Sequence, residues 1–219
     1  NNQGIRESKG EYILLLNTDT SINPGMLQVL LQEMRGNSDI GGIGPALLKG
    51  KDDYQVSFGR KINFFSELLL KSFLNTYYKM KLKRDKKERE VNWLSGACLL
   101  IKKSILKKVG LFDENFFLYF EDIDLCLRIR ENGWRLVYIP QAEVFHSGGG
   151  STKSLGLASR FHYRKSQLYF YEKHNSKISV TLLRVYLRLC FLFLLFGSCF
   201  SRHDQWKNRK NFFILLKKK

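Results

Sequence analysis

The stretch EYILLLNTDTSINPGMLQVLLQEMRG, residues Glu11–Gly36, decides the fold of this chain. Its apolar run, Glu11–Leu16, is typical of a strand buried in a parallel sheet. A polar turn follows at Asn17–Thr20, and apolar residues then recur at helical spacing up to Gly36. A strand, a polar turn and a helix in this order form the βα unit of an α/β sheet.

The helix of this unit carries start and stop signals. Asn23 is the predicted N-cap, and Pro24 suits the first helical position. Gly36 is the predicted end of the helix. The residues expected to form its apolar face are Leu27, Leu30, Leu31 and Met34.

Further strands and helices are predicted on both sides of a long excursion. The segments Ile40–Leu48 and Val91–Ile101 are predicted strands, as is Arg135–Ile139, which Pro140 is expected to close. Ile123–Arg130 is a predicted helix. The sequence therefore predicts an α/β fold with a mostly parallel sheet and flanking helices.

The excursion between the second and third predicted strands is basic and poorly periodic. It runs from Lys49 to Glu90, and some helix is expected around Phe64 to Tyr78. Cations gather at Lys79–Arg89, where no aromatic residues alternate with them for stacking on bases. This composition argues against a nucleic acid as the partner.

Composition bounds the class of protein. The chain has 219 residues, of which 44% are hydrophobic and 26% charged, which is typical of a globular protein. The net charge of +17 favours a polyanionic partner, which is a nucleic acid, a membrane surface or a phosphorylated substrate. The four cysteines form no C-x-x-C pair and lie among apolar residues, which indicates free thiols in a reducing compartment rather than a zinc site.

The C-terminal part is predicted to be helical, basic and apolar. Val180–Phe200 is interrupted by Arg184 and Arg188, and its clean part, Leu189–Phe200, is shorter than the roughly 20 residues that span a bilayer. We therefore expect a helix that lies on a membrane surface, with the cations after Phe200 against anionic lipid. The alternative is an ordinary core helix of the same protein.

Two positions could hold a divalent cation. Asp19 directly follows the first strand, and ligands of open α/β sheets collect at the carboxyl ends of strands. A carboxylate there can hold a cation that in turn holds a diphosphate, although a helix-capping role is the simpler reading. His146 precedes the glycine-rich loop Ser147–Ser151, whose backbone can approach phosphates closely.

A carboxylate pair could act as a base. Glu121 and Asp122 follow the aromatic run Phe116–Phe120, and a partly desolvated carboxylate is a stronger base. Acidic residues at a helix start also serve as partners of the helix dipole. Asp124 and Arg128, four residues apart, are a predicted structural ion pair.

Four segments together resemble a known family. In order they are NTDT at 17–20, WLSGACLLI at 93–101, FDENFFLYFEDIDLCLR at 112–128 and VFHSGGGS at 144–151. Their order and spacing resemble glycosyltransferase family 2, and within it the bacterial rhamnosyltransferase-like branch. The resemblance covers about residues 1–173.

The resemblance implies a GT-A fold, which is a Rossmann-like α/β domain. It implies a partial GT-A domain over residues 1–173, because the first strands of the family precede the position of Asn1. Residues 174–219 are then a basic, helical, membrane-associated segment with amphipathic and apolar helices.

The resemblance also assigns roles to residues. Asp19 stands at the metal-binding carboxylate of the D-x-D motif, with Mg²⁺ or Mn²⁺ as the cofactor, and His146 stands where the family completes the metal site. Asn17 replaces the first Asp of that motif. Within the E-D motif formed by Glu121 and Asp122, Asp122 corresponds to the catalytic base. The donor and acceptor sides are expected to involve Asn17, Thr18, Trp93, Ser95 and Gly96.

These roles imply an inverting transfer of a sugar from a nucleotide diphosphate sugar. The branch implies rhamnose as the sugar, and another hexose or a hexosamine is the alternative. The expected acceptor is a saccharide or a polyprenyl-linked sugar in cell-surface polysaccharide synthesis, at the cytoplasmic face of the membrane. The alternative from another class is a non-catalytic, basic fragment that binds membrane surfaces.

Overall fold

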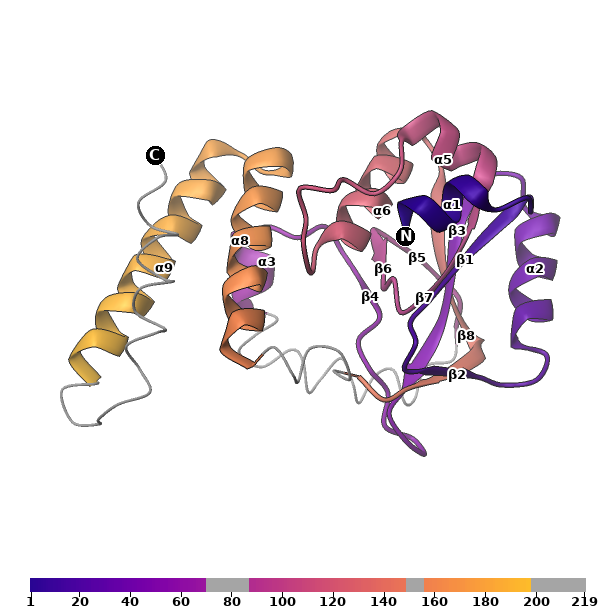
Figure 1. Ribbon diagram of the computed structural model, residues 1–219, viewed down its shortest axis with the longest axis horizontal. Helices are drawn as coiled ribbons and strands as arrows, with labels where there is room; N and C mark the ends of the chain where they lie inside the picture. The colour runs from indigo at the N-terminus through magenta and orange to yellow at the C-terminus, as the bar shows by residue number, and fades with distance from the viewer. Residues whose placement is uncertain (70–86, 149–155, 198–219) are drawn as a thin grey trace. The chain divides into compact units, whose positions relative to one another are not determined.

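The chain folds into two compact units. The computed structural model describes residues 1–69, 87–148 and 156–197 (Figure 1). The first unit comprises Asn1–Lys61, Leu68–Glu114 and Glu121–Gly150, and the second comprises Ile62–Glu67, Asn115–Phe120 and Ser151–Lys219. The division expected between residues 173 and 174 remains a prediction.

The first unit is built around a six-stranded sheet. The strands along its main path are β1 (Tyr12–Leu16), β7 (Cys98–Lys102), β3 (Ile40–Leu48), β8 (Arg135–His146) and β2 (Thr20–Ile22). The sixth strand, β5 (Arg89–Val91), also pairs with β8. A separate ribbon joins β4 (Phe58–Gly59) to β6 (Trp93–Leu94).

The α/β class is confirmed, but the expectation of a mostly parallel sheet is wrong for the described strands. β1, β3 and β8 run in the same direction, yet only β3 and β8 are hydrogen-bonded parallel neighbours among them. β7 lies between β1 and β3 and is antiparallel to both. Apolar patterning reports burial and not strand direction, so the sequence could not place β7 between them.

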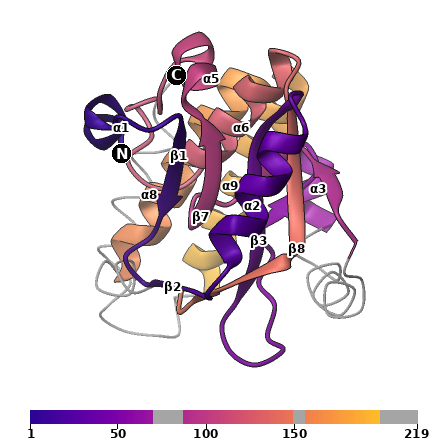
Figure 2. The same cartoon turned by 90° about the vertical axis from the view of Figure 1, so that its right-hand side faces the viewer.

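Helices cover both faces of this sheet (Figure 2). On one face, α2 (Met26–Gly36) packs Leu30 and Met34 against Ile43 and Leu100. On the other face, α5 (Lys103–Val109) and α6 (Glu121–Glu131) pack against the alternate residues of the strands, including Leu99, Ile101 and Leu136. The alternation along β7 and β8 follows from the two-residue period of a strand.

Several element boundaries differ from those predicted. Gly25, with φ +81°, is the N-cap of α2 instead of Asn23, whose carbonyl accepts a hydrogen bond from the Met26 N–H. The predicted strand Val91–Ile101 is broken between β6 and β7 because residues 95–97 bond elsewhere.

Pro140 does not end its strand, since β8 continues to His146. The register with β3 shifts between Pro45 and Ala46, which pair with Ile139 and Glu143. This irregularity leaves Pro140 without a ladder partner, so its missing N–H costs no hydrogen bond.

The second unit is helical in its described part. It contains α8 (Gly156–His174) and α9 (Lys177–Gly197), which contact each other, and most of α3 (Phe64–Leu69). The Glu67 carboxylate of α3 accepts hydrogen bonds from Tyr163, Gln167 and Tyr171 of α8. No helix within the described residues combines the length and apolarity needed to cross a membrane.

The predicted helix around Phe64 to Tyr78 is present as α3 up to Leu69, and its remainder lies outside the described residues. Most of the basic block Lys79–Arg89 and the residues after Gly197 also lie outside them.

Gly41 tests the packing between the sheet and its helices. A Cβ at this position would lie 2.7 Å from Trp134 Cβ and 2.8 Å from Ile129 Cγ2. We expect Gly41→Ala to lower the free energy of unfolding by about 1–3 kcal/mol through overpacking, measured by urea denaturation. The matched control is Gly36→Ala, where nothing lies within 4 Å of the new Cβ. It should be neutral or stabilising, because alanine favours helix by roughly 0.5–1 kcal/mol over glycine. Equal destabilisation by both changes would contradict the packing argument.

Candidate functional site

The candidate site lies at one edge of the central sheet, where β1 ends at Leu16 and β8 ends at His146. The turn after β1 is fixed by its own backbone, since the Thr20 N–H donates to Asn17 O at 3.1 Å. Thr20 then starts β2, which pairs with β8 so that Thr20 lies opposite His146. This pairing brings residues 19 and 146 together although they are far apart in the sequence.

Asp19 and His146 form the first half of the site. The His146 Nε2 atom lies 3.4 Å from Asp19 Oδ1, and both side chains are largely buried. Asn17 Nδ2 lies 3.5 Å from the same His146 nitrogen. The Ser147 N–H donates to the Asp19 carbonyl at 3.1 Å, and the Ser147 hydroxyl lies 3.4 Å from Asp19 Oδ2. The structure thus brings together three of the predicted residues.

A residue that the sequence analysis did not identify contacts the other side of the imidazole. Gln55 Oε1 lies 3.1 Å from His146 Nδ1, and the Gln55 amide nitrogen donates to the His146 backbone carbonyl. Gln55 lies in a segment that reads as an irregular excursion, and no local pattern in the sequence marks it.

Asp122 and Glu121 form the second half, at the first turn of α6. The Asp122 carboxylate accepts the Gly96 N–H and the Ile123 N–H, each at 2.8 Å. Burial raises the pKa of Asp122, while these backbone N–H groups act in the opposite direction because they stabilise the charged form. Asp122 is therefore held in one orientation by two backbone donors.

Glu121 is in a different environment from its neighbour. Its Oε2 atom is buried and has no hydrogen-bond partner in the described part of the chain. Burial raises the pKa of Glu121 from its ordinary value of 4.5 to about 7, and the adjacent charge of Asp122 contributes to the rise. A carboxyl group with a pKa near neutrality can exchange a proton at physiological pH.

Two consecutive backbone residues join the two halves. The Gly96 N–H holds Asp122, and the Ala97 carbonyl accepts the Asn17 N–H at 3.0 Å and the Thr20 hydroxyl at 3.4 Å. A Cβ at Gly96 would lie 3.2 Å from Asp122 Cβ, so glycine permits this approach. The carboxylate pair and the Asp19 turn are therefore parts of one site.

The two residues directly before Glu121 have an unusual backbone conformation. Tyr119 and Phe120 both have left-handed backbones, with φ of +68° and +69°, which is costly for residues with a Cβ. Within the second unit, the Phe120 ring packs against Tyr163 and Phe170 of α8. The Ser166 hydroxyl donates to Leu118 O at 2.7 Å. These contacts offset the cost of the conformation.

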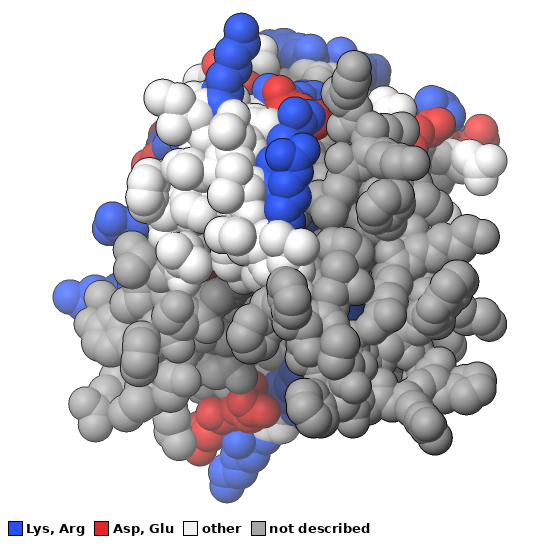
Figure 3. Space-filling view, turned by 90° about the vertical axis from the view of Figure 1, so that its left-hand side faces the viewer, with Lys and Arg blue, Asp and Glu red and all other residues white. Residues whose placement is uncertain are grey.

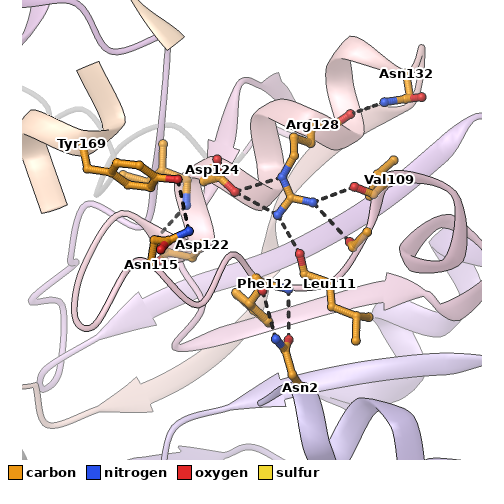
Figure 4. A network of polar contacts seen from close by, with 12 residues as sticks. Asn2, Val109, Leu111, Phe112, Asn115, Asp122, Asp124, Arg128, Asn132 and Tyr169 are labelled. Atoms are coloured by element: carbon orange, nitrogen blue, oxygen red, sulfur yellow. Dashed lines mark hydrogen bonds and ion pairs between the residues drawn. The ribbon is translucent and has the colours of Figure 1, made fainter. Parts of the chain in front are cut away.

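The predicted ion pair of Asp124 and Arg128 is confirmed, with 2.8 Å between Arg128 Nη2 and Asp124 Oδ2 and with Asp124 fully buried (Figure 4). Arg128 also donates to the carbonyls of the loop after α5, at Val109, Gly110 and Leu111. Asn2 of α1 (Asn2–Glu7) supports the same loop by bonding both backbone groups of Phe112. The network holds the segment that leads towards Glu121.

The remaining predicted residues are Thr18, Trp93 and Ser95. Thr18 is exposed in the turn after β1. The Trp93 ring packs on Gly59, where a Cβ would lie 2.7 Å from Trp93 Nε1. The Ser95 N–H donates to Ser57 O at 2.8 Å, and the Ser95 hydroxyl accepts the Ala97 N–H. Their roles in binding donor or acceptor remain predictions.

Asp19 and His146 suit a divalent cation only as part of a larger set of ligands. Within the described residues, no group of three or more His, Cys, Asp or Glu side chains could hold a metal ion. A carboxylate and an imidazole are ligands that Mg²⁺ or Mn²⁺ accepts, and Mg²⁺ is commonly bound by one or two carboxylates plus substrate phosphates. The donor set therefore fits a cation that is shared with a diphosphate.

Comparison with known proteins identifies a family model and several proteins that are similar to this chain. A family model described as glycosyltransferase like family 2 matches residues 1–167. The N-acetylglucosaminyl-diphospho-decaprenol L-rhamnosyltransferase of Mycobacterium tuberculosis is 30% identical over 177 residues, which cover 75% of this chain and 56% of that protein. The rhamnosyltransferase WbbL of Escherichia coli K12 is 32% identical over 128 residues, which cover 57% of this chain and 47% of that protein.

The chain spans about half the length of these curated relatives. Among solved structures, it is similar to the mannosyltransferase PcManGT from Pyrobaculum calidifontis, solved with GDP-Man and Mn²⁺, with a TM-score of 0.49 and 11% identity. That similarity covers 98% of this chain and 63% of the solved chain.

Glu121 gives the site a pH-dependent effect on stability. Because its pKa is raised in the folded chain, its contribution to stability is fully present below about pH 4.5 and is lost as pH rises through about 7. We expect Glu121→Gln to raise the urea midpoint, relative to the unchanged chain, more at pH 8 than at pH 5. Glu131→Gln controls for the loss of one carboxylate from the same helix. If the difference in urea midpoint between Glu121→Gln and the unchanged chain is the same at pH 5 and at pH 8, the raised pKa is contradicted.

Proposed function

This chain belongs to the family 2-like glycosyltransferases, and from that premise we propose that it transfers a sugar from a nucleotide diphosphate sugar with inversion at the anomeric carbon. The observation that carries the proposal is the link at Gly96 and Ala97, which holds Asp122 and the Asp19 turn in one site. An inverting transfer needs a base for the acceptor and positive charge at the leaving group, and this site offers a candidate for each.

In the proposed reaction, Asp122 accepts the proton of an acceptor hydroxyl. The hydroxyl oxygen attacks the anomeric carbon as the bond from that carbon to the diphosphate oxygen breaks, so the nucleoside diphosphate leaves with the bonding electrons. Asp19 and His146 would hold the Mg²⁺ or Mn²⁺, whose positive charge stabilises the leaving diphosphate. Gly96 and Ile123 keep the Asp122 carboxylate oriented, since each donates a backbone N–H to it.

We propose rhamnose as the sugar and a polyprenyl-linked saccharide as the acceptor. The support is the similarity to two rhamnosyltransferases, one of which is named for an N-acetylglucosaminyl-diphospho-decaprenol acceptor. Another hexose or a hexosamine is the alternative donor. The proposed setting is cell-surface polysaccharide synthesis at the cytoplasmic face of the membrane.

The second candidate function is a non-catalytic fragment that binds membrane surfaces. One observation favours a membrane contact in either case. α9 exposes Ile178, Val185, Leu189 and Leu192, whose spacings place them along one stripe of the helix. Leu183 and Leu187 of the same helix are buried. On the face drawn in Figure 3, uncharged surface lies beside Lys and Arg side chains.

Arg184, which interrupts the apolar run of α9, has a guanidinium that pairs with Glu172 of α8 at 2.8 Å. Peripheral binding would therefore rest on the exposed apolar stripe and on the other cations.

Asp122→Asn tests the base. Asparagine keeps the shape of aspartate but cannot accept the acceptor proton, so we expect the transfer rate to fall by about 10²–10⁴ with donor affinity little changed. The rate is measured as nucleoside diphosphate release, and donor affinity by calorimetry. Glu121→Gln is the matched control. If Glu121→Gln loses activity and Asp122→Asn keeps it, the base is Glu121.

Removal of divalent cations tests the metal. We expect EDTA to abolish transfer and excess Mg²⁺ or Mn²⁺ to restore it, because the bound cation offsets the charge of the leaving diphosphate. Full turnover in EDTA would exclude the metal from the reaction while leaving the assignment of Asp122 intact.

Sedimentation with liposomes tests the membrane contact. We expect binding to anionic vesicles that exceeds binding to neutral ones and weakens at high salt. Leu189→Glu should reduce it, because it places a charge in the exposed stripe. The control is Leu27→Glu, an equal change at an exposed leucine of α2. Protein that stays in the supernatant with both lipids would favour a soluble acceptor.

A further inference from the structure

Gln55 is fixed by the strands around it. It lies on the return of a hairpin that leaves the end of β3, where Leu48 bridges to Tyr54. The Gln55 N–H donates to Leu47 O at 2.8 Å, and the Tyr54 hydroxyl donates to Glu143 of β8 at 3.0 Å. The Gln55 side chain therefore reaches His146 from a backbone that is tied to both β3 and β8.

The hydrogen bonds of Gln55 determine which nitrogen of His146 carries the proton. The His146 backbone carbonyl can only accept, so the end of the Gln55 amide that faces it is the NH₂ group. The other end, 3.1 Å from His146 Nδ1, is then the amide oxygen, which also can only accept. Nδ1 must therefore be the donor, and in the neutral ring Nε2 carries the lone pair.

This arrangement leaves two electron-rich atoms facing each other. The Nε2 lone pair and Asp19 Oδ1 are 3.4 Å apart, and Asn17 Nδ2 approaches Nε2 at 3.5 Å. The contact of an imidazole lone pair with a carboxylate oxygen is repulsive unless a positive charge lies between them or on the ring. A cation bound by both atoms removes that repulsion.

We propose that Gln55 is a positioning residue that fixes His146 in the Nδ1–H tautomer, so that Nε2 is presented to a divalent cation together with Asp19. The proposal rests on the proposed function for the identity of the cation. Imidazole ligands commonly donate their second N–H to a neighbouring acceptor, which sets both tautomer and ring orientation. Here the acceptor is Gln55, which lies on the hairpin after β3, whereas Asp19 follows β1 and His146 ends β8.

The tautomer can be measured without metal or substrate. The full chain contains four histidines, so labelling them with ¹⁵N gives few signals, and His146→Asn identifies the signal of interest. At pH 8 and without divalent cations, we expect long-range ¹H–¹⁵N spectra to show protonated Nδ1 and unprotonated Nε2 for His146. Gln55→Leu should shift the ring towards the Nε2–H form, and Gln55→Glu, which keeps an acceptor, should retain Nδ1–H. An unchanged tautomer in Gln55→Leu, or Nε2–H in the original chain, would overturn the proposal.

Mn²⁺ binding supplies the second measurement. We expect Gln55→Leu to weaken Mn²⁺ affinity by about 10–100-fold, measured by titration calorimetry with GDP or UDP present in all samples. Gln32→Leu, the same change at an exposed position of α2, should leave affinity unchanged. Equal Mn²⁺ affinity in the Gln55→Leu variant and the original chain would contradict the positioning role. Absence of Mn²⁺ binding in every protein would instead reject the proposed metal, and the tautomer result would still decide the role of Gln55.

Discussion

The backbone of Gly96 and Ala97 is the constraint on which the site depends. One residue donates its N–H to Asp122, and the next offers its carbonyl to Asn17 and Thr20. A Cβ at Gly96 would lie 3.2 Å from Asp122 Cβ, so a larger residue would require Asp122 to shift. Because both bonds come from adjacent peptide groups, a shift of this segment would move Asp122, the proposed base, relative to the Asp19 turn, the proposed cation site. Positioning of this kind is a large part of what an enzyme contributes to a displacement reaction.

Glu121 and Asp122 are adjacent in the sequence, but their carboxylates have different hydrogen-bond partners. Asp122 is held by backbone N–H groups at the start of α6. Glu121 has a buried oxygen with no hydrogen-bond partner among the described residues, and burial raises its pKa to about 7. The left-handed backbone of Tyr119 and Phe120 directs the chain into this turn, and aromatic packing within the second unit stabilises it. Strain of this type is commonly retained where it sets the direction of functional groups.

The first half of the site consists of Asp19 and His146. Asp19 and His146 would supply only two of the ligands of the proposed cation, and the remainder would come from the diphosphate of the donor. Gln55 completes the orientation of the imidazole from a hairpin that is anchored on β3 and β8. The site is thus built at the sheet edge from the ends of β1 and β8, the link before β7 and the return from β3.

The sequence by itself determined the class of fold and most of the residues at the site. The pattern of Glu11–Gly36 predicted β1 and α2, and motif order identified Asp19, Asp122 and His146, because such signals are local along the chain. Only the tertiary structure decided that β7 runs antiparallel between β1 and β3, since burial patterns carry no strand direction. Only the tertiary structure brings the Gln55 amide into contact with the His146 imidazole and gives Glu121 and Asp122 different surroundings. Hydrogen bonds between residues about 90 apart and the burial of single oxygens arise from packing, which no local pattern encodes.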